Sequence, residues 1–514
     1  MIFVRRLLKN LFSRVVIFGL AILVQLAILV VIIWHFSNYF AAFYGAFALV
    51  SLVAVLVIVN SRANPAYKIA WIIPIMLFPI FGGIFYLMFG GNKSSRKSKR
   101  KMELIGQKTT YALGQDQEIL DQLDKEHPGA ANQARYIYDY SYYPVYTGTT
   151  SHYLSSGELK FECLLEELKK AERYIFLEYF IIEQGKMWSA ILDILVEKAQ
   201  QGIDVRVIYD DVGCLLKLPY GYDRQLESLG IKCHVFNPFR PVLSVRMNNR
   251  DHRKIAVIDG HTAITGGINL ADEYINVVER YGHWKDTSIL IHGEAVWNLV
   301  VMFLALWDWL CEIDEDYEQF KPLPQYAGQF ETDGYVQPFT DSPLDDESVS
   351  QSVFLNMIGA AKRYVYINTP YLILDNEMTT ALCLAAKRGV DVRIVTPRIG
   401  DRWFVHAVTR SNYEVLIEAG VRIYEYTPGF MHAKTFVVDD QFAVVGTINL
   451  DYRSLYLHFE CGAWLYKAKS VLEIKEDYLQ TLAVSQLITL EECHNVKWYK
   501  KLARSLLRLF APLM

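Results

Sequence analysis

The chain has 514 residues, enough for two or three domains, and 52% of them are hydrophobic. Its charge is divided unevenly, because residues 1–102 contain twelve Lys or Arg and no Asp or Glu, while the whole chain sums to −4. Residues 103–514 therefore carry a net charge of −16, which argues against a nucleic-acid groove, since such a groove needs clustered Lys and Arg. The basic N-terminal part suits an anionic surface.

Three apolar runs open the chain. Residues 15–34 follow four basic residues and are long enough to span a bilayer, with Gln25 as the one strongly polar interruption. A second run, 41–59, follows at once, which favours a transmembrane hairpin over a cleaved signal peptide. A third run, 69–91, precedes six Lys or Arg that would lie outside if it crossed, so we expect it to re-enter or to lie at the interface. Residues 1–92 are thus expected to form a membrane anchor, with the rest of the chain on the cytoplasmic side.

The soluble part is expected to be two repeated halves behind a polar linker, residues 93–135. AERYIFLEYF from Ala171 matches AKRYVYINTP from Ala361, and QGIDVRVIYDD from Gln201 matches RGVDVRIVTPR from Arg388. Strands alternate with helices in each half before a final hairpin, which predicts an α/β fold whose helices cover a sheet. The expected bounds are 136–320 for the first half, 321–346 for an acidic connector and 347–514 for the second half.

One motif occurs twice, as DHRKIAVIDGHTAITGGINLADEY from Asp251 and as MHAKTFVVDDQFAVVGTINLDYRS from Met431. In each copy a His is followed by Lys, Asp, Gly and Asn at the same four offsets. The candidate site residues of the first copy are His252, Lys254, Asp259, Gly266 and Asn269, and those of the second are His432, Lys434, Asp439, Gly446 and Asn449.

The apolar pattern predicts the geometry of each copy. IAVID and TFVVD are typical of short strands, so His and Lys share one face and the Asp points to the other, more suited to a structural role than to catalysis. A return strand would place the Gly opposite the Lys, leaving room for a ligand, and the Asn close to the His. The Asn could also cap a following helix whose amides attract an anion.

A His, a Lys and an Asn on one surface suit a phosphate, because Lys supplies charge, the amide donates hydrogen bonds and imidazole can act as nucleophile or proton donor. Two copies facing each other supply both a nucleophile and a general acid, enough for a two-step displacement at phosphorus without a metal. The seven Cys include no CxxC pair, no His has zinc-ligand spacing, and no GxxxxGK occurs. No cofactor, metal or disulfide is therefore expected.

The doubled pattern resembles the phospholipase D superfamily, and NNRDHRKIAVIDG, WKDTS, TPYLIL and INLDYRSLYLHFE are similar to segments of bacterial cardiolipin synthases. The resemblance implies two phospholipase D-like α/β sandwich halves related by a pseudo-twofold, behind an N-terminal transmembrane region of the bacterial cell membrane. It implies phosphatidyl transfer between two phosphatidylglycerol molecules, giving cardiolipin and glycerol, with His252 as nucleophile and His432 as acid and then base. A phospholipase D-type hydrolase, a transferase using another alcohol and a superfamily nuclease remain alternatives.

Further roles follow from the same resemblance. Asp286 and Glu460 are expected to orient the two imidazoles, while the Lys and Asn pairs and the two Gly hold the phosphoryl oxygens. The chain departs from the commonest pattern at Gly267 and Thr447, where Ser is frequent, and at His458, where Asn is commoner. Phosphatidylglycerol and cardiolipin are the expected partners, with no nucleic acid.

The C-terminal sequence NVKWYKKLARSLLRLFAPLM interleaves apolar with basic residues. This pattern predicts a basic amphipathic helix, suited either to an anionic membrane surface or to packing against the body of the protein.

Overall fold

A computed structural model describes the chain as two compact units: residues 1–94 with 237–249 and Leu513, and residues 95–236 with 250–512. The described residues are 20, 23–28, 30, 31, 34, 40–61, 63–78, 82, 83, 85, 86, 96–239, 248–326, 330–345 and 347–513.

The first unit contains two packed helices, α3 (Phe40–Asn60) and α4 (Pro65–Leu77). The side chain of Asn64 caps α4 by accepting from the backbone N–H of Ala66, and Ile58 and Trp71 are buried between the helices. Helix α3 covers the second apolar run, whereas half of the first run lies outside the described residues. Across the part of the chain that the structure describes, no helix combines the length and apolar character needed to cross a membrane.

The second unit begins with three helices, α6 (Arg96–Ala112), α7 (Gln117–Glu126) and α8 (Pro128–Ser141). Its first half contains β1 (Thr149–Leu154), α9 (Gly157–Lys170), β2 (Tyr174–Tyr179), α10 (Lys186–Gln200), β3 (Asp204–Asp210), α11 (Asp211–Cys214), α12 (Tyr222–Ser228), β4 (Lys232–Phe236), β5 (Lys254–Ile258), β6 (Thr262–Gly266), η3 (Asp272–Ile275), β7 (His283–Lys285), β8 (Ser288–Gly293) and α13 (Val296–Cys311), followed by the short helices η4 (Tyr317–Phe320) and η5 (Pro324–Tyr326).

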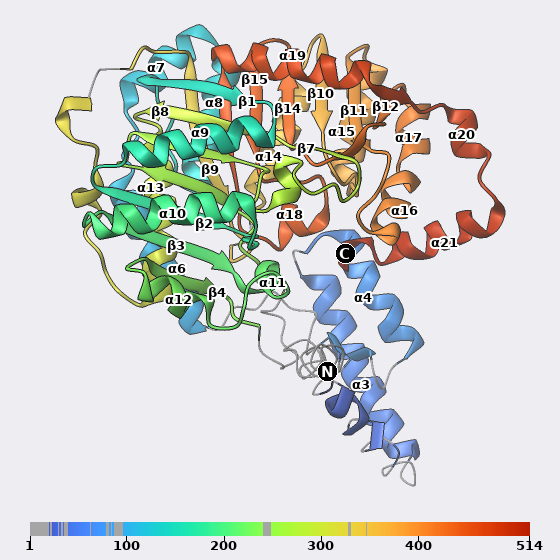
Figure 1. Ribbon diagram of the computed structural model, residues 1–514. Coiled ribbons are helices and arrows are strands. Elements are labelled where there is room, and N and C mark those ends of the chain that lie inside the picture. Colours follow the sequence, from blue (N-terminus) through green and yellow to red (C-terminus); the bar gives the residue numbers. More distant parts are fainter. Residues whose placement is uncertain are drawn as a thin grey trace, which may run out of the picture. The chain divides into compact units, whose positions relative to one another are not determined.

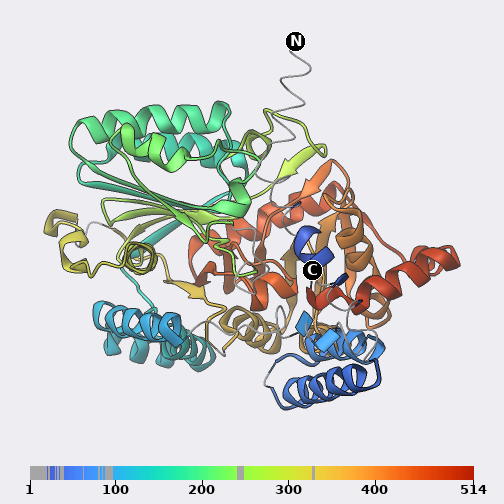
Figure 2. The ribbon, with the colours of Figure 1, turned by 90° about the horizontal axis from the view of Figure 1, so that it is seen from below.

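The second half contains β9 (Tyr335–Asp341), α14 (Val349–Ala360), β10 (Tyr364–Asn368), α15 (Asn376–Lys387), β11 (Asp391–Pro397), α16 (Trp403–Ser411), α17 (Tyr413–Glu418), β12 (Arg422–Tyr426), β13 (Gly429–Met431), β14 (Thr435–Val438), β15 (Phe442–Gly446), α18 (Tyr452–Tyr456), β16 (Glu460–Tyr466), α19 (Lys469–Ala483), β17 (Ser485–Leu487), α20 (Leu490–His494), α21 (Trp498–Leu509) and η6 (Ala511–Leu513). In Figures 1 and 2 this orange and red half lies beside the green first half.

The two sheets repeat one strand order. The first runs β1-β8-β6-β5-β2-β3-β4, and the second runs β9-β16-β15-β14-β10-β11-β12 with β17 added at its far edge. In each sheet the three strands of the strand–helix–strand part are parallel, and the first strand of the motif hairpin, β5 or β14, pairs antiparallel with β2 or β10. The predicted α/β repeat with its terminal hairpin is therefore confirmed.

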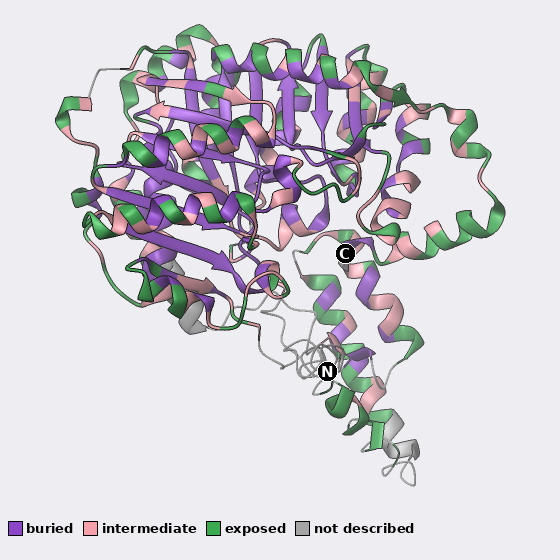
Figure 3. Cartoon of the chain, viewed as in Figure 1, coloured by how far each residue is buried: buried purple, intermediate pink, exposed green. Residues whose placement is uncertain are grey.

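Alternation along β2 explains how the first sheet is covered on both faces. Ile175 and Leu177 pack in the core beneath α9 and α10, whereas Tyr174 and Phe176 point the other way, into the core that contains α13. Helix α13 is almost entirely apolar, and its core continues into the second sheet, so it joins the two halves. Figure 3 shows the strands as a continuous buried interior beneath the exposed outer faces of the helices.

The region expected as a polar linker contributes to this core. Leu120 and Leu123 of α7 and Ala134 of α8 are buried in the same apolar cluster as α13. The predicted domain bounds are not tested by this packing and stay a prediction.

Candidate active site

The two motif histidines are each tied through the backbone to the opposite half. The N–H of His252 donates to the carbonyl oxygen of Phe459 over 2.9 Å, and the N–H of His432 donates to that of Lys285 over 2.7 Å. The second link extends a parallel pairing between β7 of the first half and β13 of the second. The chain therefore brings both imidazoles to the seam between the halves.

Each imidazole is held by an acid that comes from the opposite half. Nδ1 of His252 lies 3.0 Å from both carboxylate oxygens of Glu460, and Nδ1 of His432 lies 2.6 Å from Oδ2 of Asp286. Both acids are fully buried. A carboxylate that accepts the Nδ1 proton leaves Nε2 with its lone pair, the form that a nucleophile or base requires.

The Gly and Thr that distinguish the two motif copies fit these acids. A Cβ at Gly267 would lie 2.1 Å from Oδ1 of Asp286, so that position has no room for a side chain. In the second copy, Thr447 instead donates its hydroxyl to Oε2 of Glu460. Gly267, which stands where Ser is frequent, thus makes space for Asp286, while the hydroxyl of Thr447 holds Glu460.

The two motif lysines are buried between the imidazoles and the strands. Lys254 donates from Nζ to the carbonyl oxygen of His252, and Lys434 does the same to His432. Burial lowers the pKa of each Lys to about 8, although nearby carboxylates oppose the shift. Below that pH both remain cations in a confined space, where they can stabilise phosphoryl oxygens.

Both imidazoles are held neutral. Burial, reinforced by the charge of the neighbouring lysines, lowers the pKa of His432 to about 4 and that of His252 well below its usual range. Burial also raises the pKa of Glu460 to about 7. In the absence of substrate, His252 therefore already has the protonation state of a nucleophile.

The motif aspartates take a structural position. Asp259 accepts from the backbone N–H groups of residues 172, 173 and 174, and Asp439 accepts from those of residues 362, 363 and 364, over 2.6 to 2.9 Å. Both aspartates sit in the hairpin turn with positive φ. They fix each hairpin to the start of the neighbouring strand, and among the described residues neither carboxylate bonds the imidazole of His252 or His432.

The motif asparagines differ from the expectation that they cap helices. Asp451 caps α18 by accepting from Ser454, and Ala271 precedes η3, two residues after each Asn. The amide of Asn269 donates to the Tyr274 hydroxyl over 2.7 Å, and Oδ1 of Asn449 has no hydrogen-bond partner in the described part of the chain. Contact of either amide with a phosphate stays a prediction.

The motif glycines are required by strand packing. A Cβ at Gly266 would lie 2.5 Å from the carbonyl oxygen of Thr287, and one at Gly446 would lie 2.4 Å from that of Cys461. The neighbouring strand therefore fills the space that a side chain at either position would need. Their role in binding phosphate stays a prediction.

One group beside the site has metal-ligand character. His252, His458 and Glu460 place nitrogen and oxygen atoms within 4.8 Å of one another. The Nδ1 atom of His252 is already engaged by Glu460, which fits an orienting contact as well as a metal site. The expectation that catalysis uses no metal stays a prediction.

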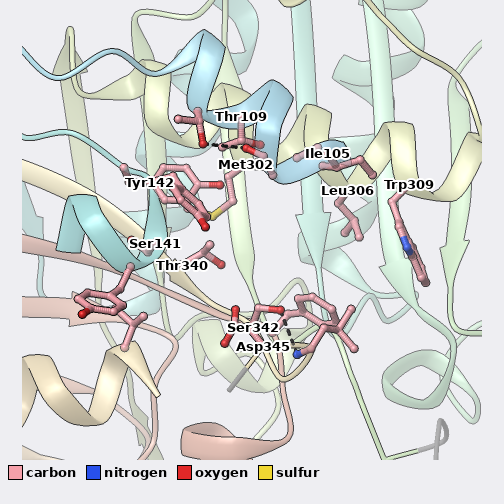
Figure 4. Close-up of a pocket in the computed structure, with 18 of the residues that line it drawn as sticks. Ile105, Thr109, Ser141, Tyr142, Met302, Leu306, Trp309, Thr340, Ser342 and Asp345 are labelled. Carbon is pink, nitrogen blue, oxygen red and sulfur yellow. Dashed lines mark hydrogen bonds between the residues drawn. The ribbon is translucent and has the colours of Figure 1, made fainter. Parts of the chain in front are cut away.

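A cavity of about 580 Å³ lies on another side of the same segments. Figure 4 shows Ile105, Met302, Leu306 and Trp309 on its apolar walls. Its lining includes Arg253 and Phe459, the sequence neighbours of His252 and Glu460, but none of the motif histidines or lysines. The cavity is therefore distinct from the seam that holds the imidazoles.

Two α/β halves that bring a doubled His-x-Lys pattern to one seam define a phospholipase D-like protein. The family model described as cardiolipin synthase, PLD-like domain, matches residues 164–290 and 354–482, and that of the phospholipase D-nuclease N-terminal region matches residues 49–91. A solved structure, phosphatidylserine synthase of Haemophilus influenzae Rd KW20, shares the fold with a TM-score of 0.55 at 14% identity, over 74% of this chain and 97% of that chain.

Relatives extend the match over most of the chain. An uncharacterised protein of Streptococcus mutans serotype c is 44% identical over 461 residues, covering 90% of this chain and 99% of that protein. The cardiolipin synthase of Halalkalibacterium halodurans is 35% identical over 476 residues, covering 91% and 94%. The chain belongs to the cardiolipin synthase family of phospholipase D-like proteins.

Replacing Gly267 by Thr should displace Asp286 from His432, because the new Cβ would overlap the carboxylate. We expect the rate of phospholipid turnover to fall about ten-thousand-fold, as when an imidazole loses the carboxylate that sets its tautomer. Gly359→Thr is the matched control, since a Cβ there meets nothing within 4 Å. A folded Gly267→Thr protein with the full rate would contradict this reading.

The buried lysines predict the alkaline limit of activity. Because kcat/KM reports the free enzyme, it should fall as pH rises through about 8, where Lys254 and Lys434 lose their charge. Measurement between pH 5 and pH 10 checks this, and the double variant Lys254→Arg with Lys434→Arg, which keeps both charges, should move the limit upward. A profile that stays flat to pH 10 would show that the lysine charges are not needed.

Proposed function

We propose that the protein is a cardiolipin synthase that transfers a phosphatidyl group from one phosphatidylglycerol to another, releasing glycerol. The observation that carries the proposal is the pair of neutral imidazoles at one seam, each held by a carboxylate from the opposite half and flanked by a buried Lys. The name of the relative from Halalkalibacterium halodurans supports cardiolipin as the product.

The first step forms a covalent intermediate. Nε2 of His252 attacks the phosphorus of the donor, a nitrogen–phosphorus bond forms, and the bond from phosphorus to the glycerol oxygen breaks. His432 donates a proton to that oxygen, so glycerol leaves as a neutral alcohol. His432 must be protonated at this point, and the bound phosphodiester favours this because its negative charge offsets the lysines that lower the His432 pKa.

The second step reverses the roles. His432 now accepts a proton from a hydroxyl of the second phosphatidylglycerol, the hydroxyl oxygen bonds to phosphorus, and the nitrogen–phosphorus bond to His252 breaks. Lys254 and Lys434 stabilise the negative charge that builds on the phosphoryl oxygens in both steps. Asn269 and Asn449 are proposed to assist them, with the glycines close to the same oxygens.

The acceptor decides between related activities. Water in place of the second lipid would make the protein a phospholipase D-type hydrolase, and a different alcohol would make another phosphatidyltransferase. The products formed from labelled phosphatidylglycerol in vesicles distinguish these activities, because each acceptor gives a different phospholipid.

We also propose that the protein acts at the bacterial cell membrane as a multi-pass protein, with residues 1–92 as anchor, 93–135 as linker, and the two halves at 136–320 and 347–514 on the cytoplasmic side. Support comes from the exposed apolar side chains of α3, which include Leu49, Leu52, Leu56 and Val59. The match of residues 49–91 to a family N-terminal region adds to this.

The mechanism requires both imidazoles. Incubation of the full chain in lipid vesicles with labelled phosphatidylglycerol should give cardiolipin and free glycerol in equal amounts. His252→Ala and His432→Ala should each lower the rate by about a thousand-fold or more, because each removes a role that the other cannot fill. Cardiolipin and glycerol are measured by chromatography.

His292→Ala is a matched control, since His292 bonds Thr262 at the far end of the first hairpin. If phosphatidic acid is the main product, water is the acceptor and the protein is a hydrolase rather than a transferase. Full activity in either motif variant would overturn the mechanism.

The C-terminal helix α21 offers a second contact with the membrane. Trp498 is 76% exposed and lies among Lys and Arg, so we expect it to enter an anionic bilayer. Brominated phosphatidylglycerol in vesicles should quench the fluorescence of the full chain less in Trp498→Phe than in the unmodified protein. Trp464→Phe, at a buried position, should leave the quenching unchanged. Equal quenching of the Trp498→Phe and unmodified proteins would show that α21 does not enter the bilayer.

A further inference from the structure

The proposed reaction needs two anion sites. The acceptor phosphatidylglycerol carries its own phosphodiester, one glycerol away from the phosphorus under attack, and cardiolipin keeps both charges. Lys254 and Lys434 face the reacting phosphate and leave the second one without a cation. A second basic group beside the seam would serve it, and this inference rests on the proposed function.

Two arginines bracket the turn that carries His458. The carbonyl oxygen of Arg453 accepts from the N–H groups of residues 457 and 458 over 2.9 Å, and that of Arg250 accepts from Phe459 over 2.8 Å. The next residue, Glu460, holds the imidazole of His252. Both guanidinium groups therefore start within a few residues of the catalytic seam.

A third arginine approaches from the other imidazole. Arg402 is exposed at the start of α16, directly after Asp401, whose backbone oxygen accepts from the Tyr281 hydroxyl over 3.4 Å. The Tyr281 ring contacts Phe430, and Phe430 stacks on His432 with ring centres 5.6 Å apart. The backbone next to Arg402 is thus linked to the His432 ring through two aromatic side chains.

Arg453 is the central member of this group. Its half-buried guanidinium makes no side-chain hydrogen bond or ion pair with any residue that the structure describes. Burial lowers its pKa, the nearby carboxylate of Asp451 opposes this, and repulsion from Arg402 and Arg250 adds to it. Asp451, which also caps α18, and Asp210, which pairs with Arg250 over 3.5 Å, offset part of the charge of the three arginines, and the guanidinium of Arg453 itself keeps no ion-pair partner among the described residues.

His458 adds a hydrogen-bond donor at the same place. Its ring centre lies 5.6 Å from that of His252, and neither ring nitrogen has a hydrogen-bond partner in the described part of the chain, although both are buried. Burial, together with the charges of His252, Arg453 and other neighbours, lowers its pKa well below the usual range. A neutral imidazole still offers one N–H, and a buried unpaired donor is costly unless a ligand uses it.

We propose that Arg453, Arg402 and His458, backed by Arg250, form a second anion subsite that binds the phosphodiester of the acceptor lipid. The subsite selects a hydroxyl attached to a phosphodiester over water or a neutral alcohol. It thereby favours cardiolipin over phosphatidic acid as the product of the second step.

The test compares two soluble acceptors that differ by the phosphodiester. Differently labelled glycerol and glycerophosphoglycerol, the deacylated headgroup of phosphatidylglycerol, compete at equal concentration for phosphatidyl groups from phosphatidylglycerol in vesicles. The product ratio measures the ratio of their kcat/KM values. The unmodified protein should prefer glycerophosphoglycerol about ten-fold or more, the value of one charge-assisted hydrogen bond.

Arg453→Gln and Arg402→Gln should each reduce this preference at least about five-fold, and His458→Gln should reduce it less because a neutral donor is weaker. Arg402 is exposed, so its variant is expected to fold even if Arg453→Gln does not. Arg422→Gln is the matched control, since Arg422 is exposed and pairs with Asp391 at the start of β11.

The outcomes are distinct. The subsite is overturned if the unmodified protein does not prefer glycerophosphoglycerol to glycerol. It is also overturned if the arginine variants slow transfer to both acceptors equally, because the arginines would then bind the reacting phosphate or stabilise the folded protein. A preference that Arg422→Gln removes equally would also overturn it. If the unmodified protein transfers to neither acceptor and makes no cardiolipin, the proposed function fails instead.

Discussion

The exchange of carboxylates between the halves is the interaction on which the site depends. Glu460 of the second half holds His252 of the first, and Asp286 of the first holds His432 of the second. Because both acids are buried, removing either histidine would take a hydrogen bond from a buried carboxylate, a loss of about 1–3 kcal/mol for buried polar groups generally. The α13 core and the β7–β13 pairing hold the halves in the register that these contacts require.

Burial gives the site its chemistry as well as its geometry. Burial lowers the pKa of both imidazoles and so keeps them neutral. It also lowers the pKa of the two lysines. A phosphodiester entering this space meets cations that little solvent screens, and its charge returns a proton to His432. Binding and proton supply are thus coupled through one electrostatic environment rather than through a moving part.

Much of this could be predicted from local sequence. Period-two alternation and the turn residues located both hairpins, and the odd spacing of Asp259 and Asp439 correctly placed them away from the imidazoles. The crossing of Asp286 and Glu460 could not be predicted, because it depends on how one half faces the other. Asn449 does not cap α18, because a better acceptor, Asp451, follows two residues later, and the residue that precedes η3 is Ala271 rather than Asn269. Arg402 is distant in sequence from both motifs, so no spacing pattern could indicate it.

The different neighbours of the two acids break the symmetry that the repeated strand order suggests. Glu460 receives a hydroxyl donor from Thr447, whereas Asp286 lies against the bare backbone of Gly267 and accepts the N–H of Thr287. Two imidazoles with unequal partners have unequal affinities for a proton. This inequality is built into the resting protein while both imidazoles are still neutral, and it decides which of them the charge of an arriving lipid protonates.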